Sequence, residues 1–151
     1  FEKMADSLGG GLAVAEETIQ KLLQKKILTE EEAKSVSPSD VMAFFDGEIG
    51  KRAALAAKEG RLYKETPFTY AMDMDDEEIF VQGIIDCFFI EEGEIVLLDY
   101  KTNYVSSEED KERIRKTYKV QLQIYKEALE EAKGMKVKES YLYLNGLSEF
   151  I

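Results

Sequence analysis

The sequence predicts an α/β fold in which helices precede a mixed sheet of about four strands. Apolar residues in the first third of the chain recur at helical spacing, and the pattern becomes that of strands after Gly60. A long amphipathic segment then separates the third strand from the last one. We therefore expect a three-strand antiparallel meander, a crossover helix and a further strand, preceded by N-terminal helices.

Three helices are predicted in the first sixty residues. Thr29 followed by Glu32 matches a capping box, in which each side chain satisfies a backbone donor at the start of a helix. Ser37 and Pro38 suit the N-cap and the first helical position. The helices are expected at residues 12–27, after Thr29, and from Pro38 to Gly60 with a break near Gly47.

Three strands follow, at about 62–71, 79–90 and 94–101. The second and third are apolar at almost every position, which is typical of strands that are buried on both faces. Residues 108–133 are expected to form the crossover helix and residues 137–144 the last strand. Because two strands joined by a crossover helix normally run parallel, the last strand should lie parallel to a member of the sheet.

The charge distribution bears on nucleic-acid binding. A net charge of −11 argues against unaided capture of nucleic acid, because affinity for phosphate comes largely from Lys and Arg. Residues 61–100 hold two basic and eleven acidic residues, whereas residues 101–126 hold seven basic and four acidic residues. This arrangement suits a site at which cations mediate contact with phosphates, although on charge alone the ordinary solubility of an acidic protein is the better explanation.

The cysteine content and the hydropathy exclude several classes of protein. The lone Cys87 excludes a disulfide framework and any cluster that needs four thiolates from this chain. No stretch approaches a membrane span, and no basic leader precedes an apolar run. We expect a cytoplasmic protein with no membrane partner. Because the first residue is Phe1, we also expect the chain to be a fragment of a longer protein.

The turn between the second and third strands brings ionisable residues together. Residues 91–94 read Glu-Glu-Gly-Glu and predict a two-residue hairpin turn, in which the glycine supplies a positive φ. If the first and last of these residues pair, Asp86 and Asp99 lie directly opposite each other, with Cβ atoms about 5 Å apart on one face. Lys101 lies two residues after Asp99, so its side chain leaves the same face.

Such a trio in apolar strands is costly unless it has a function, because like charges repel and burial disfavours the charged form of a carboxylate. One interpretation is that Lys101 neutralises one aspartate while the other lies at a solvated strand end. The other is a hard divalent cation held by Asp86, Asp99 and the backbone carbonyl of Tyr100. Oxygen ligands favour Mg²⁺ or Mn²⁺, and the absence of His disfavours zinc.

Three ordered blocks carry a resemblance to a known family. They are Gly83-Ile84-Ile85-Asp86, Asp99-Tyr100-Lys101-Thr102 and Gln121-Leu122-Gln123-Ile124-Tyr125. Together they resemble the PD-(D/E)xK nucleases of the RecB family, most closely the C-terminal nuclease domain of a helicase–nuclease that processes double-strand breaks. The resemblance extends from about Leu28 onward. It implies a restriction-endonuclease-like core in a single nuclease domain over residues 1–151, with a helical lead-in over 1–60 and a catalytic core over 61–151.

The resemblance also implies an activity and the residues that perform it. The family hydrolyses DNA with Mg²⁺, for which Mn²⁺ substitutes. Asp86 and Asp99 correspond to metal ligands and Lys101 to the catalytic lysine. Gln121 and Tyr125 correspond to a glutamine–tyrosine helix motif that helps to position DNA, and they lie one helical turn apart. Packing in the core explains Tyr125 equally well.

Other residues have two interpretations each. Glu65 lies on the first strand, where Pro67 indicates an edge or a bulge. It is either a support for the metal site or a surface glutamate. Tyr100, Tyr104 and Tyr118 are able to stack on bases, but packing explains each of them as easily, and no DNA role is assigned to them.

One departure from the family concerns histidine. Members usually place a histidine on an early helix, where it completes the metal site, and this chain contains none. Either the chain begins after that helix or the protein lacks the residue, and the Gly9-Gly10-Gly11 run is also consistent with an altered junction. An incomplete metal site, with weak metal binding or no activity, is one expected outcome for the isolated chain.

Two functions from different classes follow. The first is a Mg²⁺-dependent exonuclease domain that receives single strands from a helicase motor outside this chain, where ATP serves only the motor and a partner subunit completes the parent protein. The second is a nuclease-like structural module that binds DNA or a partner protein without cutting. The intact trio favours the first function and the missing histidine favours the second. An acidic protein-interaction domain, the third possibility, would depend on neither metal nor DNA.

Overall fold

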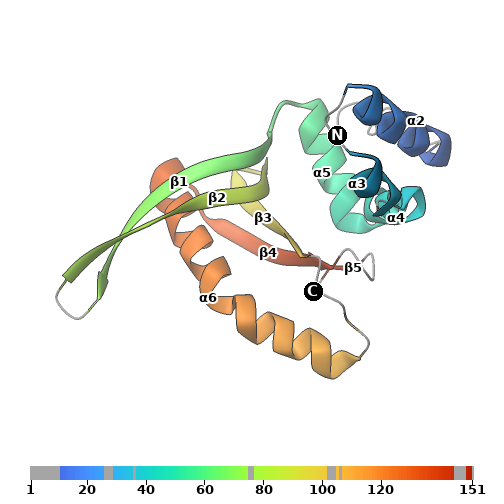
Figure 1. The fold of residues 1–151 in the computed structure, drawn as a ribbon. Coiled ribbons are helices and arrows are strands. Elements are labelled where there is room, and N and C mark those ends of the chain that lie inside the picture. The colour runs from blue at the N-terminus through green and yellow to red at the C-terminus, as the bar shows by residue number, and fades with distance from the viewer. Residues whose placement is uncertain are drawn as a thin grey trace.

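The computed structural model describes residues 11–25, 29–35, 37–74, 77–101, 105, 107–144 and 149–150. The helices that precede the sheet are α2 (Gly11–Gln24), α3 (Glu30–Ser35), α4 (Pro38–Asp46) and α5 (Glu48–Lys58). They are followed by β1 (Leu62–Met74), β2 (Glu77–Glu91), β3 (Glu94–Lys101), α6 (Glu108–Lys133), β4 (Val137–Leu144) and β5 (Glu149–Phe150), as Figure 1 shows. Thr102, Tyr104, Gly9 and Gly10 lie outside the described residues.

The predicted helix boundaries around the break are confirmed. Helix α4 begins at Pro38, and Gly47 separates it from α5. Gly50 explains why the two helices pack so closely at this corner. A Cβ atom at Gly50 would lie 1.8 Å from the backbone oxygen of Phe44, so any larger residue would push the helices apart. The close packing places Phe44 and Phe45 over the sheet.

The sheet has the order β1-β2-β3-β4-β5. The β1–β2 and β2–β3 pairs are antiparallel, and β4, which follows helix α6 in the chain, runs parallel to β3. The expected meander, crossover helix and parallel last strand are therefore confirmed. The short β5 pairs antiparallel with β4 and adds a fifth strand to the four that were expected.

Both faces of the sheet carry a core. On one face, α4 and α5 pack on side chains of β2 and β3, among them Phe89 and Leu98. On the other face, α6 packs on the sheet through Tyr125 and Leu129, and a neighbouring cluster contains Ile114. Burial of this kind is the main favourable contribution to folding. It leaves β3 in the centre of the molecule, where the side chains of residues 95–98 have no solvent exposure.

Helix α6 occupies the predicted residues, 108–133, and has a cap at each end. The hydroxyl of Ser107 accepts a hydrogen bond from the backbone N–H of Asp110 at 3.1 Å. Gly134 ends the helix in the left-handed conformation, with φ of 63°. None of the described helices is long and apolar enough to cross a membrane.

The β2–β3 turn has the predicted form. Glu92 and Gly93 both have positive φ, 55° and 82°, as a type I′ turn requires. The ladder runs from Glu91↔Glu94 to Cys87↔Leu98, which is the predicted register. The two-residue turn therefore determines which residues of β2 and β3 lie opposite each other.

Strands β1 and β2 continue beyond the rest of the sheet as a two-stranded arm (Figure 1). The expectation that β2 is buried on both faces is wrong for this part. Phe80 is 63% exposed and Ile84 is 57% exposed, because no described element packs on their side of the arm. We call this side the outer face of the arm. It consists of Pro67, Thr69, Ala71, Phe80, Gln82 and Ile84, which are all exposed and uncharged.

Candidate active site

Asp99 is the only charged side chain that is buried among the described residues, with 1% of its surface exposed. Burial raises the pKa of its carboxyl above the usual value, Lys101 opposes that rise, and the charge of Asp86 adds to it. The oxygen Oδ2 lies 2.5 Å from Nζ of Lys101. No hydrogen bond of ordinary geometry reaches this oxygen. A buried carboxylate of this kind is a candidate ligand for a cation.

Asp86 is held at the seam between β2 and β3. Its Oδ2 accepts a hydrogen bond from the backbone N–H of Tyr100 at 2.9 Å. The regular β2–β3 ladder stops one residue earlier, at Cys87↔Leu98, so the register places Asp86 opposite Asp99 but the two do not form a ladder pair. The hydrogen bond that the Asp86 side chain accepts from Tyr100 therefore lies just beyond the end of the regular ladder.

Tyr100 contributes its backbone to this place and its side chain to the opposite face. The ring packs with Phe44 and Tyr143, with centroids 6.0 and 6.1 Å away. Burial raises the pKa of its hydroxyl well above the usual range. The backbone N–H of Tyr100 donates a hydrogen bond to Asp86. The backbone carbonyl of the same residue is the atom that was predicted to bind the metal ion.

Glu65, Asp86 and Asp99 occupy one row across β1, β2 and β3. The β1–β2 pairs on either side of this row are Lys64↔Cys87 and Thr66↔Ile85, and regular pairing skips Glu65 and Asp86 between them. The sheet is therefore irregular in both hairpins at the row that carries three carboxylates.

The irregularity changes which side chains face α6. Glu65 has φ of 46°, in the left-handed region that residues other than glycine rarely adopt. Before Glu65, the ring of Tyr63 lies 5.1 Å from Nζ of Lys133 on α6. Beyond it, Phe68 packs edge-on against Tyr125 of the same helix, with centroids 5.3 Å apart. Strict alternation would send Tyr63 and Phe68 to opposite faces. The predicted edge position of β1 is confirmed, and its irregularity lies at Glu65, two residues before Pro67.

A hollow of about 440 Å³ opens at this row and is lined by Lys64, Glu65, Asp86 and Tyr100. It gives Glu65 and Asp86 access to solvent, which Asp99 lacks. Lys64 was not among the predicted site residues. Knowledge of the β1–β2 register would have placed Lys64 at the site. The sequence does not reveal that register, because no glycine marks a turn between the two strands.

Lys101 lies between β3 and α6. Its side chain is 13% exposed, and its Nζ lies 4.3 Å from the centroid of the Tyr118 ring. The ion pair with Asp99 is the neutralisation that one interpretation of the sequence described. Tyr118 was assigned no role from sequence, although it lies on α6 one turn before Gln121 and Leu122.

Gln121 and Tyr125 lie together, as their spacing predicts. The amide Nε2 of Gln121 donates a hydrogen bond to the hydroxyl of Tyr125 at 2.6 Å. The Tyr125 ring is buried in the core against Phe68. Both side chains line a second hollow, of about 340 Å³, with residues of β1 and β2. Gly83 belongs to this hollow, and a Cβ atom there would lie 2.9 Å from the Phe68 ring.

The chemistry of the donors suits a weakly held hard cation. Among the described residues, no three Asp, Glu or Cys side chains lie close enough together to form a metal site. Mg²⁺, however, is commonly bound through one or two carboxylates, with waters and substrate phosphates as its other ligands. Asp86, Asp99 and the backbone of Tyr100 offer oxygen donors of this kind. The residues therefore fit an open Mg²⁺ site better than a closed structural one.

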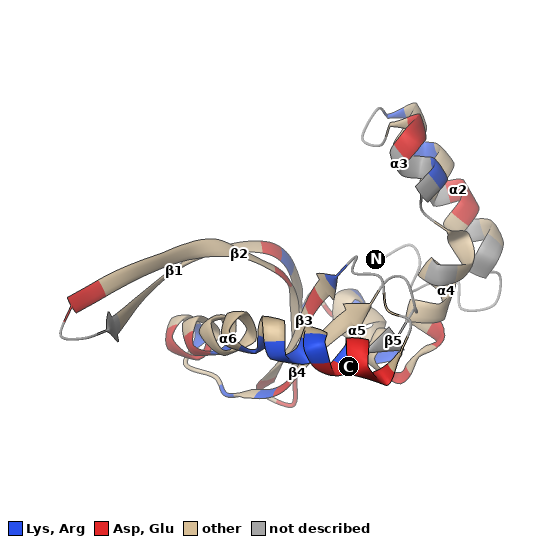
Figure 2. Ribbon diagram, turned by 60° about the horizontal axis from the view of Figure 1, so that its bottom comes forward, with Lys and Arg blue, Asp and Glu red and all other residues tan. Residues whose placement is uncertain are grey.

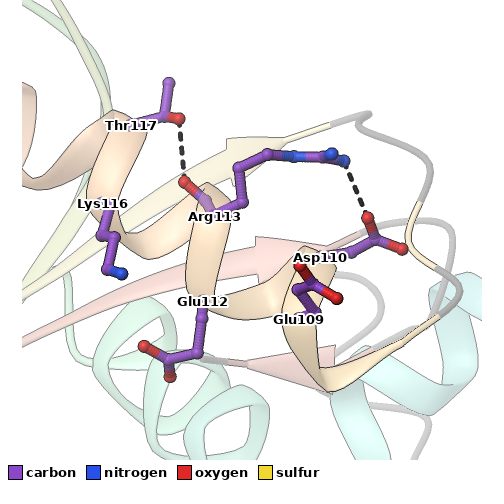
Figure 3. Close-up of a pocket in the computed structure, with 6 residues that line it drawn as sticks. All are labelled: Glu109, Asp110, Glu112, Arg113, Lys116 and Thr117. Atoms are coloured by element: carbon purple, nitrogen blue, oxygen red, sulfur yellow. Dashed lines mark hydrogen bonds and ion pairs between the residues drawn. The ribbon is translucent and has the colours of Figure 1, made fainter.

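A wider hollow, of about 670 Å³, lies along the first turns of α6 and has a different character. Its lining side chains all come from that helix, as Figure 3 shows. Arg113 forms an ion pair with Asp110 at 2.7 Å, and the Thr117 hydroxyl donates to the backbone oxygen of Arg113 at 2.8 Å. These contacts are those of an ordinary charged helix surface, and the hollow has no part in the candidate site.

The fold and the site together define a class of protein. A mixed sheet with a crossover helix presents an Asp-x-Lys pair at the end of its central strand, next to a second aspartate. Residues 1–149 match the PD-(D/E)XK nuclease superfamily, and the chain belongs to that superfamily.

The relatives with similar sequences indicate a narrower group within this superfamily. Each of them is the A subunit of an ATP-dependent helicase/nuclease. The chain is 37% identical over 147 residues to this protein of Clostridium botulinum. It is 43% identical over 137 residues to that of Clostridium acetobutylicum, and 42% over 140 residues to that of Thermoanaerobacter sp.. The alignments cover 89%, 83% and 85% of this chain and 11% of each relative. The predicted resemblance to a helicase–nuclease of the AddA type is confirmed.

Proposed function

We propose that this chain is a Mg²⁺-dependent DNA exonuclease domain that hydrolyses phosphodiester bonds during the processing of double-strand breaks. The observation that carries the proposal is the buried Asp99 beside Lys101, 2.5 Å apart, in a member of a nuclease superfamily. Residues 1–60 are the helical lead-in of this domain and residues 61–151 its catalytic core.

Each site residue has a role in the proposal. Asp86, Asp99 and the carbonyl of Tyr100 hold Mg²⁺, for which Mn²⁺ substitutes. Such an ion supplies, when bound, a Lewis acid that lowers the pKa of water and offsets phosphate charge. Lys101 donates to the attacking water or to a phosphate oxygen, where its charge stabilises the negative charge that develops.

Three further residues support this arrangement. Glu65 lies in the row of Asp86 and Asp99 and lines the same hollow as Asp86, which suits a support for the metal site. Gln121 and Tyr125 position DNA through the hydrogen-bonded pair that they form on α6. The burial of the Tyr125 ring leaves Gln121 as the more accessible member of the pair.

The DNA is proposed to arrive as single strands from a helicase motor. The net charge of −11 disfavours unaided capture, and the relatives that carry this domain are about nine times as long as the aligned segment. ATP serves only the motor, and an AddB-type partner subunit completes the parent protein. The assembly is proposed to act in the cytoplasm, where chromosomal DNA lies.

A second candidate is a nuclease-like structural module that binds DNA or a partner protein without cutting. The absence of His from the 151 residues favours it. So does the finding that no three acidic or thiol side chains of the described residues gather as a metal site. In this case Asp99 and Lys101 serve only to pair with each other.

The two candidates are separated by the variant Asp99→Asn, which keeps the shape of the side chain and removes its charge. The proposed nuclease degrades labelled single-stranded DNA with Mg²⁺ or Mn²⁺, and Asp99→Asn should slow that degradation roughly 10²-fold or more, because a proposed ligand of the metal ion loses its charge. Glu94→Gln is the matched control, because it removes one carboxylate from the other end of β3 and should cleave like the wild type.

Two results would contradict the nuclease. The first is cleavage by Asp99→Asn at the wild-type rate. The second is the absence of cleavage both from this chain and from a full-length protein that carries it, while urea unfolding shows a folded domain. The second result would favour the structural module.

A further inference from the structure

We infer that Tyr118 is a positioning residue for Lys101, and this inference rests on the proposed function. Tyr118 lies outside the three sequence blocks that carry the family resemblance. The centroid of its ring is 4.3 Å from Nζ of Lys101, which is within the range of a cation–π interaction. The ring comes from α6 and the lysine from β3, so the contact joins the helix to the proposed catalytic lysine.

Lys101 needs more than one partner to keep its ammonium group in one place. A lysine side chain has a flexible four-carbon stem, and its charge has no preferred direction of bonding. The ion pair with Asp99 restricts the distance from one oxygen only. The face of the Tyr118 ring adds a second restraint from another direction. Because the lysine side chain is 13% exposed, little water competes for this contact.

The Tyr118 ring is itself firmly placed. It packs against a buried cluster that contains Ile114, one turn earlier on α6, and Leu144 of β4. Leu144 is also the ladder partner of Lys101 in the parallel β3–β4 pair. The same packing therefore fixes the ring and the strand from which the lysine extends.

The type of partner suits the proposed reaction. Asp99 is proposed to ligate Mg²⁺, and a carboxylate that shares its charge with a metal ion holds an ammonium group less strongly. An aromatic ring attracts the cation through its quadrupole and carries no net charge. Tyr118 thus keeps Lys101 in place without neutralising the positive charge that the reaction requires, and without competing for the metal or the phosphate.

The contact is tested by NMR, independently of activity. A ring face at this distance shifts the signals of the Lys101 ε-methylene protons upfield. The shift should be present in the wild type and in Tyr118→Phe, and it should be lost in Tyr118→Leu. Tyr63→Leu is the matched control, because it removes a ring that lies 5.1 Å from Lys133 at the other end of α6 and should leave the Lys101 signals unchanged.

The positioning role is tested by cleavage of single-stranded DNA with Mg²⁺. Tyr118→Leu should lower kcat about tenfold with KM unchanged, as expected for loss of a desolvated cation–π contact. Tyr118→Phe should restore kcat to near the wild-type value, and Tyr63→Leu should not lower it. A purely structural role of Tyr118 would lower thermal stability without this separation between the Phe and Leu variants.

Each other outcome overturns a definite part of the inference. A Lys101 shift that persists in Tyr118→Leu overturns the contact. A lost shift with unchanged kcat overturns the positioning role, and so does a Tyr118→Phe variant that keeps the shift but loses kcat. If Tyr118→Leu does not fold, the Phe variant and Tyr118→Met, whose side chain has similar length and no ring, give the same comparison. Absence of cleavage both from the wild-type chain and from a full-length protein that carries it contradicts the proposed function instead, and the NMR comparison still decides the contact.

Discussion

Glu65 adopts a backbone conformation that favours glycine, next to a hollow lined by carboxylates. A residue with a Cβ atom loses roughly 1 kcal/mol in the left-handed region. Strained residues of this kind persist where the surrounding structure or a function requires them. Glu65 therefore has two roles. Its left-handed backbone conformation changes which side chains of β1 face α6, and its carboxylate supports the proposed metal site.

A pair of substitutions separates these two roles. Glu65→Gly and Glu65→Ala both remove the carboxylate, but only the glycine relieves the strain, so Glu65→Gly should be more stable than Glu65→Ala by about 1 kcal/mol. Urea unfolding measures this difference. Both variants should lose Mg²⁺-dependent cleavage to the same extent. Equal stability would show that the conformation is not strained, and wild-type cleavage in both would remove Glu65 from the metal site.

Sequence reasoning finds some site residues and misses others for a physical reason. Asp86 and Asp99 were predicted to lie opposite each other because a two-residue turn with a glycine determines the register of its strands. The segment between β1 and β2, residues 73–78, is acidic apart from Met74 and contains no glycine to mark a turn. The row that adds Glu65 could not be predicted for this reason. No role was predicted for Tyr118, because packing explains a tyrosine on an apolar helix stripe equally well.

At the scale of the elements, a charge cluster ties α5 to two parts of the sheet. Arg52 donates two hydrogen bonds to Glu91, at 3.0 and 2.7 Å, and forms an ion pair with Glu139 of β4 at 2.8 Å. Lys138 also binds Glu91 at 2.7 Å. Bidentate pairs of this type are among the stronger surface interactions. They join the helix, the β2–β3 turn and the last long strand.

The charge cluster around Glu91 predicts how the free energy of unfolding depends on pH. Arg52 and then Lys138 lower the pKa of Glu91 from 4.5 to about 2. The stabilisation is therefore complete above about pH 4.5 and is lost as the pH falls toward about 2. Glu91→Gln should cost on the order of 1 kcal/mol at pH 7, after allowance for solvent screening, and the difference from the wild type should vanish near pH 2.

Urea unfolding over this pH range measures the effect. Glu92→Gln is the control, because Glu92 is the exposed neighbour of Glu91 and makes only a 3.7 Å ion pair with Lys138. A cost of Glu91→Gln that stays constant down to pH 2 would show that packing, and not charge, is responsible.

The elements themselves were predicted with different success. Helix α6 and strands β3 and β4 have the predicted bounds, because caps, glycines and a long amphipathic stripe mark them. The burial of β2 was not predictable from its apolar residues. An apolar run shows that a strand can be buried, but it does not show what covers each face. The bare outer face of the arm is the result.

At the scale of the whole molecule, that outer face is an exception on a chain with 34% charged residues. Figure 2 shows the arm almost free of acidic and basic residues between its tip and its base. Net charge keeps such surfaces apart in solution. As the pH approaches the sequence pI of about 4.6, the repulsion between copies disappears and the apolar arm is expected to self-associate.

Sedimentation velocity near pH 5 tests this expectation. Phe80→Lys places a charge in the centre of the outer face and should reduce self-association clearly. Leu55→Lys is the control, because Leu55 is similarly exposed, at 56%, but lies on α5. Equal effects of the two substitutions would show that total charge matters and the arm does not.

The parallel pairing of β3 with β4 also determines an order of assembly. The strands β1, β2 and β3 follow one another closely in the chain, so their antiparallel pairing requires little loop-closure entropy and can form early in folding. Strand β4 can join β3 only after the 26-residue helix α6 has crossed the sheet. We therefore expect the carboxylate row to form in the early, local part of the folding reaction. The Tyr118 ring that covers Lys101 packs against Leu144 of β4, so we expect the lysine to be held firmly only once β4 has joined the sheet.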